Sequence, residues 1–251
     1  MSDSRWLDVP GAYNVRDLGG YLTTDGKTTR WRAFLRADSL HNLSESTKSA
    51  LIEYGVRTVI DLRRTNETVD TPNALADMDD IRYFHLNMIG DTNPPGYIAP
   101  PPDEWTTPEL TSNIYRVLLD QRQDVISETL VTLAESKGHT AIYHCAAGTD
   151  RTGIISALLL GLAGVPADTI AKDYALSAHG LRRRYLAEGI PESLAGKDFS
   201  LEEPPEFLAP PLAMERTLQH LSDKYGGIES YVRHIGLIDA QINDIRNMMR
   251  E

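Results

Sequence analysis

Apolar residues recur along the chain at two different spacings, and segments of the two kinds alternate. Short runs rich in β-branched residues predict buried strands at residues 56–62, 81–89 and 140–144. Longer segments with an apolar residue every three or four positions predict helices. The predicted helices cover residues 44–55, 108–138 (as two helices), 151–163, 167–178, 212–225 and 228–249, the last broken near Gly236.

Residues that begin and end helices flank the first of these segments. Ser44 is placed as an N-cap, and Gly55 follows the helix as a C-cap glycine. The pair Asp25 and Gly26 predicts the turn of a hairpin over residues 21–37. Because strands alternate with helices, we expect an α/β fold with a mostly parallel sheet of four or five strands, flanked by helices, and an N-terminal hairpin.

Two stretches rich in proline interrupt this pattern. Residues 90–108 predict a long loop, and loops of that length in a compact domain are often functional. Residues 187–211 predict either a lid or an exposed connection. Open parallel sheets bind ligands at the carboxyl ends of their strands. The strand at residues 140–144 therefore points to a site directly after it.

The composition is that of an ordinary globular protein, with 41% apolar and 24% charged residues among 251. The net charge of −11 argues against nucleic acid or an anionic membrane as a partner, although one cleft can still be basic. The N-terminus lacks the apolar stretch of a secretory signal, and the longest apolar run is too short to span a bilayer. We expect a cytoplasmic protein without an integral membrane segment, with export by a route lacking a sequence signal left open.

The single cysteine, Cys145, lies in the sequence HCAAGTDRTG. A strand ends before it at His144, and a helix begins after a tight turn, near Arg151. Such a turn exposes successive backbone N–H groups at a helix N-terminus, where they bind anions. The small side chains of the turn let an oxyanion approach the backbone, and Arg151 supplies a planar fork for two phosphate oxygens. The predicted phosphate-binding residues are Ala146, Ala147, Gly148, Thr149, Asp150, Arg151 and Thr152.

The same electrostatic field stabilises a thiolate. We therefore predict that Cys145 attacks the phosphorus atom of a bound phosphoryl group and forms a phosphocysteine, which water hydrolyses. Thr152 is placed to hydrogen-bond the sulfur, and Arg151 to stabilise the equatorial oxygens. A lone cysteine is otherwise most often buried and inert.

Other phosphate or metal sites fit the sequence less well. One cysteine and scattered histidines lack the spacing of zinc ligands, so we expect no metal and no cofactor. The segment GTDRTG lacks the lysine of a nucleotide-binding P-loop. The expected partner is a phosphorylated protein or a small phosphomonoester, and the sequence leaves the oligomeric state open.

The pattern Cys-x5-Arg resembles the signature of the protein tyrosine phosphatase superfamily. Its longer form, with Asp150 before Arg151 and then Thr152 and Gly153, is similar to the bacterial and fungal branch typified by mycobacterial protein tyrosine phosphatase B. The segments that carry the same resemblance are NVRDLGGY at 14–21, FLRADSL at 34–40, VIDLRRTNE at 59–67 and LSDKYGGIESYVRHIGL near the C-terminus. It covers nearly the whole chain and implies one tyrosine-phosphatase-like domain over residues 1–251, acting on phosphotyrosine, with phosphoserine and phosphothreonine as further candidate substrates.

The chain departs from the family at Thr149, where a lysine is frequent. In the family that lysine is associated with phosphoinositide and dual-specificity activity. Its absence weakens a phosphoinositide phosphatase interpretation, which stays open together with a phosphate-binding module that has lost catalysis.

The leaving group needs a proton from a carboxyl group within reach. The resemblance implies Asp150 as this general acid. Asp61, at the end of a predicted strand, and Asp91, on the long loop, are the alternatives.

Four further residues have either a catalytic or a structural interpretation. His144 either changes the reactivity of the Cys145 thiolate or has a structural role at the end of the strand. Arg16 either reaches the active site or holds the N-terminal segment through a salt bridge. Asp17 is assigned to the structural role, and Arg63 forms an ion pair with Asp61 or lines the pocket. The basic run at 181–185 is either a solvated helix face or steers anionic substrates.

Overall fold

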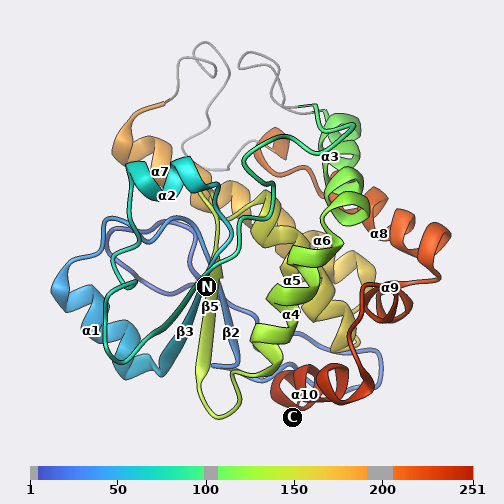
Figure 1. Ribbon diagram of the computed structural model, residues 1–251, viewed down its shortest axis with the longest axis horizontal. Helices are drawn as coiled ribbons and strands as arrows, with labels where there is room; N and C mark the ends of the chain where they lie inside the picture. The colour runs from blue at the N-terminus through green and yellow to red at the C-terminus, as the bar shows by residue number, and fades with distance from the viewer. Residues whose placement is uncertain (1–4, 99–106, 191–205, 251) are drawn as a thin grey trace.

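The computed structural model describes residues 5–98, 107–190 and 206–250. A five-stranded sheet with the order β1-β2-β5-β3-β4 forms its centre (Figure 1). Only the β1–β2 pair is antiparallel, and the other three pairs are parallel. The strands are β1 (Arg16–Asp17), β2 (Phe34–Ala37), β3 (Val56–Asp61), β4 (Arg82–His85) and β5 (Thr140–His144).

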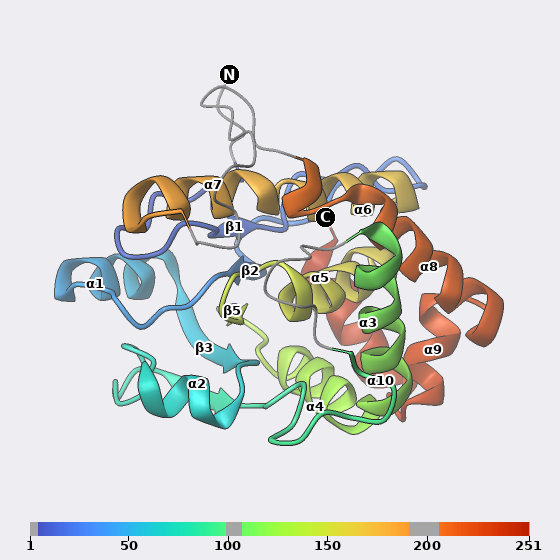
Figure 2. The same ribbon diagram turned by 90° about the horizontal axis from the view of Figure 1, so that it is seen from above.

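Helices cover both faces of the sheet. Figure 2 shows α1 on one side of the strands, and α4 and α5 on the other. The helices are α1 (Glu45–Tyr54), α2 (Thr65–Asp70), α3 (Pro108–Gln121), α4 (Gln123–Ala134), α5 (Asp150–Leu162), α6 (Ala167–Ala175), α7 (Ser177–Glu188), α8 (Pro211–Tyr225), α9 (Ile228–His234) and α10 (Asp239–Met249), with a 3-10 turn, η2, at Glu206–Leu208.

Alternation along the strands divides the interior into two cores. Phe34 and Tyr143 face the larger core, which contains the apolar faces of α3 to α6 and α8 to α10. Leu35 and Ile142 face the smaller core, which contains Leu51 of α1. Successive side chains of a strand point to opposite faces, so the central strands are buried on both sides.

The regular segments agree closely with the sequence predictions. The Ser44 side chain accepts a hydrogen bond from Thr47 N at the start of α1, and Gly55 ends that helix with a left-handed φ of 114°. Strand β5 has the predicted bounds, and the last predicted helix is divided at Gly236 into α9 and α10. The predicted α/β fold with a mostly parallel sheet is confirmed.

The predicted N-terminal hairpin is present as the antiparallel pair β1–β2, although its first strand lies before the predicted range of 21–37. The turn at Gly26 is present, with Gly26 N donating to Thr23 O at 3.0 Å, but only a single bridge joins Leu22 to Thr28. The antiparallel partner of β2 is β1, and the carboxylate of Asp17 at the end of β1 accepts backbone hydrogen bonds from the distant Arg32 and from its neighbour Gly19.

Other differences lie in segments with weak apolar periodicity. Helix α2 buries no residue, so no apolar pattern marks it. The predicted helix at 167–178 is divided between α6 and α7, and α7 continues through the basic run at 181–185. Parts of both proline-rich stretches, residues 99–106 and 191–205, lie outside the described residues, so the predicted lid is not tested. Among the described residues, no helix is long and apolar enough to cross a membrane.

A buried charge cluster joins β1, β2 and α6. Arg36 Nη1 lies 2.5 Å from the Asp173 carboxylate, and Arg16 Nε lies 3.7 Å from it. Burial alone would raise the pKa of Asp173, but the two guanidinium groups and the Tyr21 hydroxyl lower it. Burial and the charge of Arg36 lower the pKa of Arg16 to about 10. Asp173 is therefore the counter-charge that two buried arginines share.

We predict that Asp173→Asn lowers the free energy of unfolding by about 3–5 kcal/mol, because it leaves two buried guanidinium groups without a counter-charge. Urea unfolding at neutral pH measures this loss. Because the pKa of Asp173 is lowered in the folded protein, its stabilisation is present above about pH 4 and is lost as the pH falls. The difference between variant and wild type should therefore shrink in acid.

Asp168→Asn is the matched control, because Asp168 is on the same helix in an exposed pair with Lys172. That variant should keep close to the wild-type stability, because an exposed ion pair contributes little. Equal losses in the two variants would contradict the role assigned to the buried cluster.

Candidate active site

Cys145 follows the last residue of β5, at the carboxyl edge of the sheet. The neighbouring His144 is in register with Ala37 of β2 and Asp61 of β3, so three strands end together here. The Cys145 residue is only 1% exposed, and α5 begins five residues later at Asp150. We name residues 145–151 the phosphate loop. The predicted strand–turn–helix arrangement is present.

Three carbonyl groups of the phosphate loop are held from outside the loop. Their donors come from the N-terminal segment, from β2 and the residues after it, and from α7. The hydrogen bonds run from Ser39 N (3.2 Å) and Arg184 Nη1 (3.1 Å) to Ala146 O, from Asn14 Nδ2 to Ala147 O (2.9 Å) and from Arg36 Nη2 to Gly148 O (2.8 Å). The three carbonyl groups point away from the inside of the loop and are hydrogen-bonded there, and these bonds hold the loop backbone in one conformation.

The backbone N–H groups of residues 146–149 have no acceptor among the described residues. Together with the N-terminus of α5, they form a row of donors that suits an oxyanion. Gly148 permits this curvature with a φ of 70°. A Cβ atom there would lie 2.7 Å from both Ala37 O and Asp38 N, so only glycine fits.

Arg151 is held by a residue that the sequence did not single out. Its Nη1 and Nη2 atoms lie 2.7 and 3.2 Å from the two carboxylate oxygens of Glu67, on α2. Nη1 also donates to Leu62 O at 3.3 Å. Burial opposes the charge of Arg151, but Cys145, Glu67 and Asp150 together raise its pKa above the usual value. Glu67 thus fixes the guanidinium beside the phosphate loop.

Asp61 lies in a buried network with His144, the residue before Cys145. Its carboxylate accepts from Arg63 Nη2 at 2.6 Å and from Tyr83 Oη at 3.2 Å, and His144 Nε2 lies 3.4 Å away. Burial alone would raise the pKa of Asp61, but His144 and Arg63 lower it below its usual range. The geometry therefore favours the ion-pair interpretation, with Asp61 as an anion.

His144 has both ring nitrogens engaged. Nε2 lies 2.7 Å from Asn73 Nδ2, and Nδ1 lies 3.1 Å from the backbone oxygen of Cys145. The ring is completely buried, so it supports the strand end beneath the thiol.

Asp150 is exposed at the start of α5, next to Arg151. Its Oδ1 accepts a 2.6 Å hydrogen bond from Tyr115 Oη, which lies 2.7 Å from Tyr174 Oη. Burial and the Asp150 carboxylate raise the pKa of Tyr115 well above its ordinary value, so this hydroxyl keeps its proton. Two buried tyrosines therefore hold an exposed carboxyl group at the phosphate loop.

The remaining predicted residues have mainly structural contacts. Arg16 donates to the Asn14 side chain and so supports the phosphate loop from behind. Asp17 accepts from Tyr54 Oη at 2.7 Å in addition to two backbone N–H groups, as a structural role predicts. Asp91 accepts from Asn87 Nδ2 at 2.9 Å on the loop after β4. The Thr152 hydroxyl lies 3.5 Å from Ala37 O, and no contact with the sulfur is present among the described residues.

The basic run on α7 lies at the edge of the site. Arg184 contacts Ala146 O and Glu188, which gives it a direct connection to the phosphate loop. Arg183 stacks on the Trp6 ring, with 4.3 Å between its guanidinium carbon and the ring centroid. Substrate steering by this run stays a prediction.

Sequence reasoning missed several residues that complete the site. Asn14, Arg36 and Glu67 stand within the quoted motif segments, but nothing in their spacing assigns them a partner. Tyr115 is 35 residues from Asp150 in sequence, inside an ordinary amphipathic helix. No cluster of three or more potential metal-ligating side chains lies within the described residues.

Comparisons with known proteins agree with this geometry. A family model described as the tyrosine phosphatase family matches residues 7–251. The chain is similar to a tyrosine-protein phosphatase of Nostoc commune, at 30% identity over 227 residues, which covers 85% of this chain and 73% of that protein. It is also similar to the triple specificity protein phosphatase PtpB of Mycobacterium tuberculosis, at 25% identity over 284 residues, which covers 96% and 98% of the two chains.

We predict that Gly148→Ala abolishes binding of tungstate, a tetrahedral oxyanion, because the new Cβ atom meets backbone atoms that cannot move aside. Binding is measured by isothermal titration calorimetry, and stability by thermal unfolding.

Gly26→Ala is the matched control, since Gly26 also has a positive φ, but a Cβ atom added there would have no atom within 4 Å. It should lose about 1–2 kcal/mol of stability and keep tungstate affinity. Unchanged tungstate binding in a folded Gly148→Ala protein would contradict the donor row.

Proposed function

Because the chain belongs to the tyrosine phosphatase family, it is a phosphatase, and we propose that it hydrolyses phosphotyrosine through a phosphocysteine on Cys145. The single observation that carries this proposal is that Cys145 begins a loop whose next four backbone N–H groups have no acceptor among the described residues, and that it interacts electrostatically with Arg151 at the end of this loop. The match over residues 7–251 and the continuity of the sheet also support a single domain.

The proposed reaction has two steps. In the first, Cys145 Sγ attacks phosphorus, the bond from phosphorus to the ester oxygen breaks, and Asp150 gives its proton to that oxygen. In the second, Asp150 takes a proton from water, the water oxygen attacks phosphorus, and the electron pair of the S–P bond returns to sulfur. Free phosphate and the regenerated thiolate are the products.

Arg151 is arranged to bind two phosphate oxygens. The Glu67 carboxylate accepts one N–H group from Nη1 and one from Nη2. Leu62 O accepts the second N–H group of Nη1. This leaves Nε–H and the second Nη2–H, which lie on the same side of the guanidinium and form a fork for a phosphoryl group. No acceptor for Nε is present among the described residues. Glu67 is therefore proposed to orient this fork, because without its partner the side chain would adopt many rotamers.

Asp150 is the proposed general acid. Asp61 is unsuited to give a proton because Arg63 and His144 keep it ionised and buried. Asp150 is exposed and lies beside the phosphate loop. A tyrosine hydroxyl both donates and accepts, so the Tyr115–Tyr174 pair can reverse its hydrogen bonds and serve either protonation state of Asp150.

The substrate class rests on the relatives as well as the site. One relative is named a tyrosine-protein phosphatase and the other a triple specificity phosphatase, which supports phosphotyrosine with phosphoserine and phosphothreonine as further substrates. Thr149 stands where the family often has a lysine, and its side chain is uncharged. The residue is also only 3% exposed, so it offers no positive charge to a substrate. This favours phosphopeptides over phosphoinositides.

We predict that Cys145→Ser lowers kcat on 4-nitrophenyl phosphate by at least about a thousandfold, because the hydroxyl cannot replace the thiolate. Turnover of phosphopeptides and of a phosphoinositide panel by the wild type tests the substrate class. Turnover of phosphoinositides but not phosphopeptides would favour the lipid alternative. Tight tungstate binding without any turnover by the wild type would favour a non-catalytic module.

We predict that Asp150→Asn lowers kcat on phenyl phosphate by about 10²–10³, because phenolate needs a proton to leave. On 4-nitrophenyl phosphate, whose leaving group is stable without a proton, the loss should stay below about tenfold. The decline of activity toward high pH should disappear in the variant.

Asp91→Asn is the control for a solvent-exposed carboxylate, and it should keep the wild-type pH profile. Tyr115→Phe should shift the profile of phenyl phosphate hydrolysis without abolishing it, as expected for a positioning residue. If Asp91→Asn instead loses the alkaline decline, the assignment of Asp150 is wrong.

A further inference from the structure

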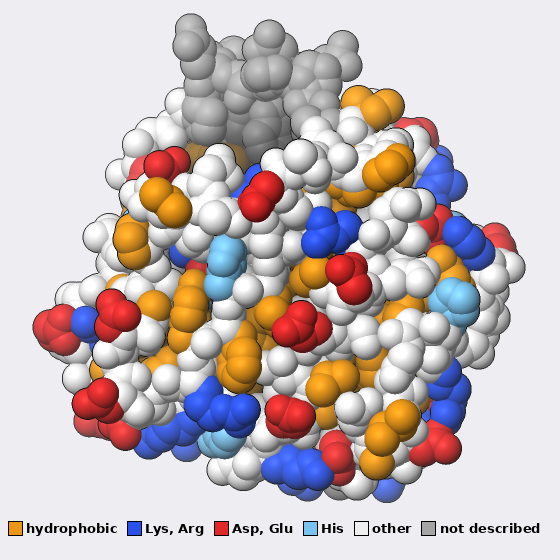
Figure 3. Space-filling view, viewed as in Figure 1, with side chains coloured by type: hydrophobic (Ala, Val, Ile, Leu, Met, Phe, Trp, Pro, Cys, Tyr) orange, Lys and Arg blue, Asp and Glu red, His pale blue; other side chains and the backbone are white. Residues whose placement is uncertain are grey.

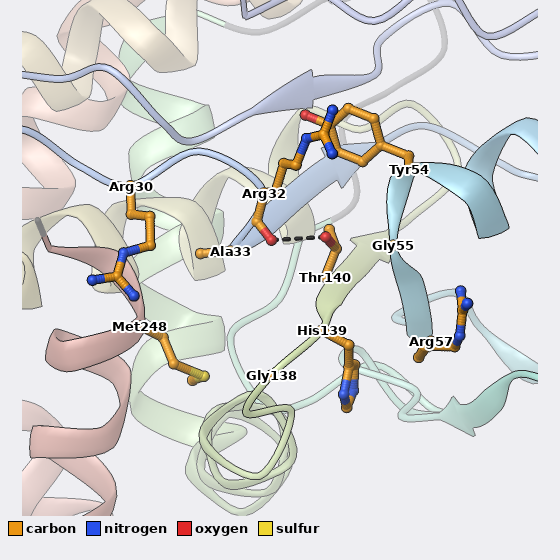
Figure 4. A pocket seen from close by; sticks show the side chains of 10 residues that line it. All are labelled: Arg30, Arg32, Ala33, Tyr54, Gly55, Arg57, Gly138, His139, Thr140 and Met248. Atoms are coloured by element: carbon orange, nitrogen blue, oxygen red, sulfur yellow. Dashed lines mark hydrogen bonds between the residues drawn. The ribbon is translucent and has the colours of Figure 1, made fainter.

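A basic pocket of about 520 Å³ lies at the opposite edge of the sheet from Cys145. Figure 4 shows its lining at the start of β2, β3 and β5, where Ala33 and Thr140 form the centre. Thr140 and Cys145 are separated by the length of β5, roughly 16 Å at about 3.3 Å per residue. The pocket is therefore separate from the phosphate loop.

Three arginines and one histidine line this pocket, and no acidic residue of the described part of the chain does. They are Arg30, Arg32, Arg57 and His139. The chain as a whole has 36 acidic and 25 basic residues, and Figure 3 shows the two kinds mixed over one face of the molecule. A pocket whose charged lining residues are all arginines therefore differs from the mixed surface of this acidic chain.

Carbonyl groups hold two of these arginines, Arg30 and Arg57, and the Tyr54 ring holds the third, Arg32. Within the described residues, none of their guanidinium groups forms an ion pair within 4.0 Å, although most other arginines in that part of the chain do. Arg57 Nη1 donates to Ile52 O and Val56 O, and Arg30 Nη2 donates to Arg250 O. These carbonyl contacts hold the side chains of Arg30 and Arg57 in place and leave other N–H groups of both guanidinium groups for a ligand.

Arg32 is fixed in an uncommon backbone conformation. Its φ of 62° makes it the one non-glycine residue with a positive φ among the described residues. Arg32 N donates to Asp17 Oδ2 at 2.8 Å, and Arg32 O accepts from Thr140 Oγ1 at 2.7 Å. The guanidinium carbon then lies 4.7 Å from the centroid of the Tyr54 ring (Figure 4). Such strain is typical of functional positions, where a side chain has to be presented in one direction.

The field in the pocket is positive at His139 as well. Burial, and then the charges of Arg82 and Arg57, lower the pKa of His139. A bound anion would offset these charges. The guanidinium groups offer planar forks that match phosphate oxygens, and together they carry three positive charges.

We propose that the pocket lined by Arg30, Arg32, Arg57 and His139 binds a small diphosphate-bearing anion at a site independent of the phosphatase centre. Its volume lies within the range of about 300–1,000 Å³ that is usual for small-molecule sites. Two linked phosphate groups balance the charge of the three arginines, and inorganic pyrophosphate is the simplest probe.

Isothermal titration calorimetry with pyrophosphate tests the proposal after the phosphatase centre has been closed. Because Cys145 is the sole cysteine, carboxymethylation with iodoacetate places one carboxylate in the phosphate loop and repels anions there. The carboxymethylated protein should still bind one pyrophosphate, and its affinity should fall with rising salt. No binding heat at about millimolar pyrophosphate would overturn the proposal.

Arg32→Gly and Arg57→Gln should each weaken pyrophosphate binding about tenfold or more. Arg32→Gly removes the charge and the backbone strain together while keeping the N–H bond to Asp17, so the fold is retained, and near-ultraviolet circular dichroism verifies this. Arg116→Gln, an exposed arginine of α3 outside the pocket, is the control and should bind like the wild type.

Two results would contradict the assignment. One is equal affinity of the wild type, Arg32→Gly and Arg57→Gln for pyrophosphate. The other is tighter binding of citrate than of pyrophosphate, because the site would then prefer carboxylates to phosphates.

Discussion

The geometry of the site depends on hydrogen bonds to the carbonyl groups of the phosphate loop. Their donors lie outside the loop. Asn14, Ser39 and Arg36 bind these carbonyls, and they come from segments more than 100 residues before Cys145. Arg36 is held in turn by Asp173. The loop therefore acquires its row of N–H donors only when β1, β2 and α6 have assembled around it. Catalytic geometry and folding depend on the same contacts.

The carboxyl groups around the phosphate loop fall into two kinds, those that pair with an arginine and the one that pairs with a tyrosine hydroxyl. Glu67 and Asp61 each face an arginine, and the pKa of each carboxyl group is lowered, so both remain anions that position Arg151 and the strand end. Asp150 is the carboxyl group at the loop that has a hydroxyl partner, Tyr115, in place of a guanidinium. In the proposed mechanism, this division leaves Arg151 as a fixed cation between Cys145, the proposed nucleophile, and Asp150, the proposed proton donor.

The sequence predicted what depends on local pattern. Strand β5, the turn after it and the start of α5 followed from periodicity and from the Cys-x5-Arg spacing, and the cap residues of α1 were also correct. The contacts of Glu67 and Tyr115 could not be predicted, because they join residues 84 and 35 positions apart through folded geometry. The hairpin was predicted, but the position of its first strand at Arg16–Asp17 was not, because this strand has only two residues and its Asp17 side chain bonds to the distant Arg32 N.

The central claim of the proposed mechanism is that the phosphoryl group is bonded covalently to the Cys145 sulfur during turnover. Rapid acid quench of the wild type during turnover of 4-nitrophenyl phosphate, followed by peptide mass spectrometry, tests it most directly. We expect a phosphoryl adduct on the peptide that contains Cys145, formed in the first turnover and lost on dilution of substrate. A phosphoryl group on another residue, or turnover without any adduct, would contradict it.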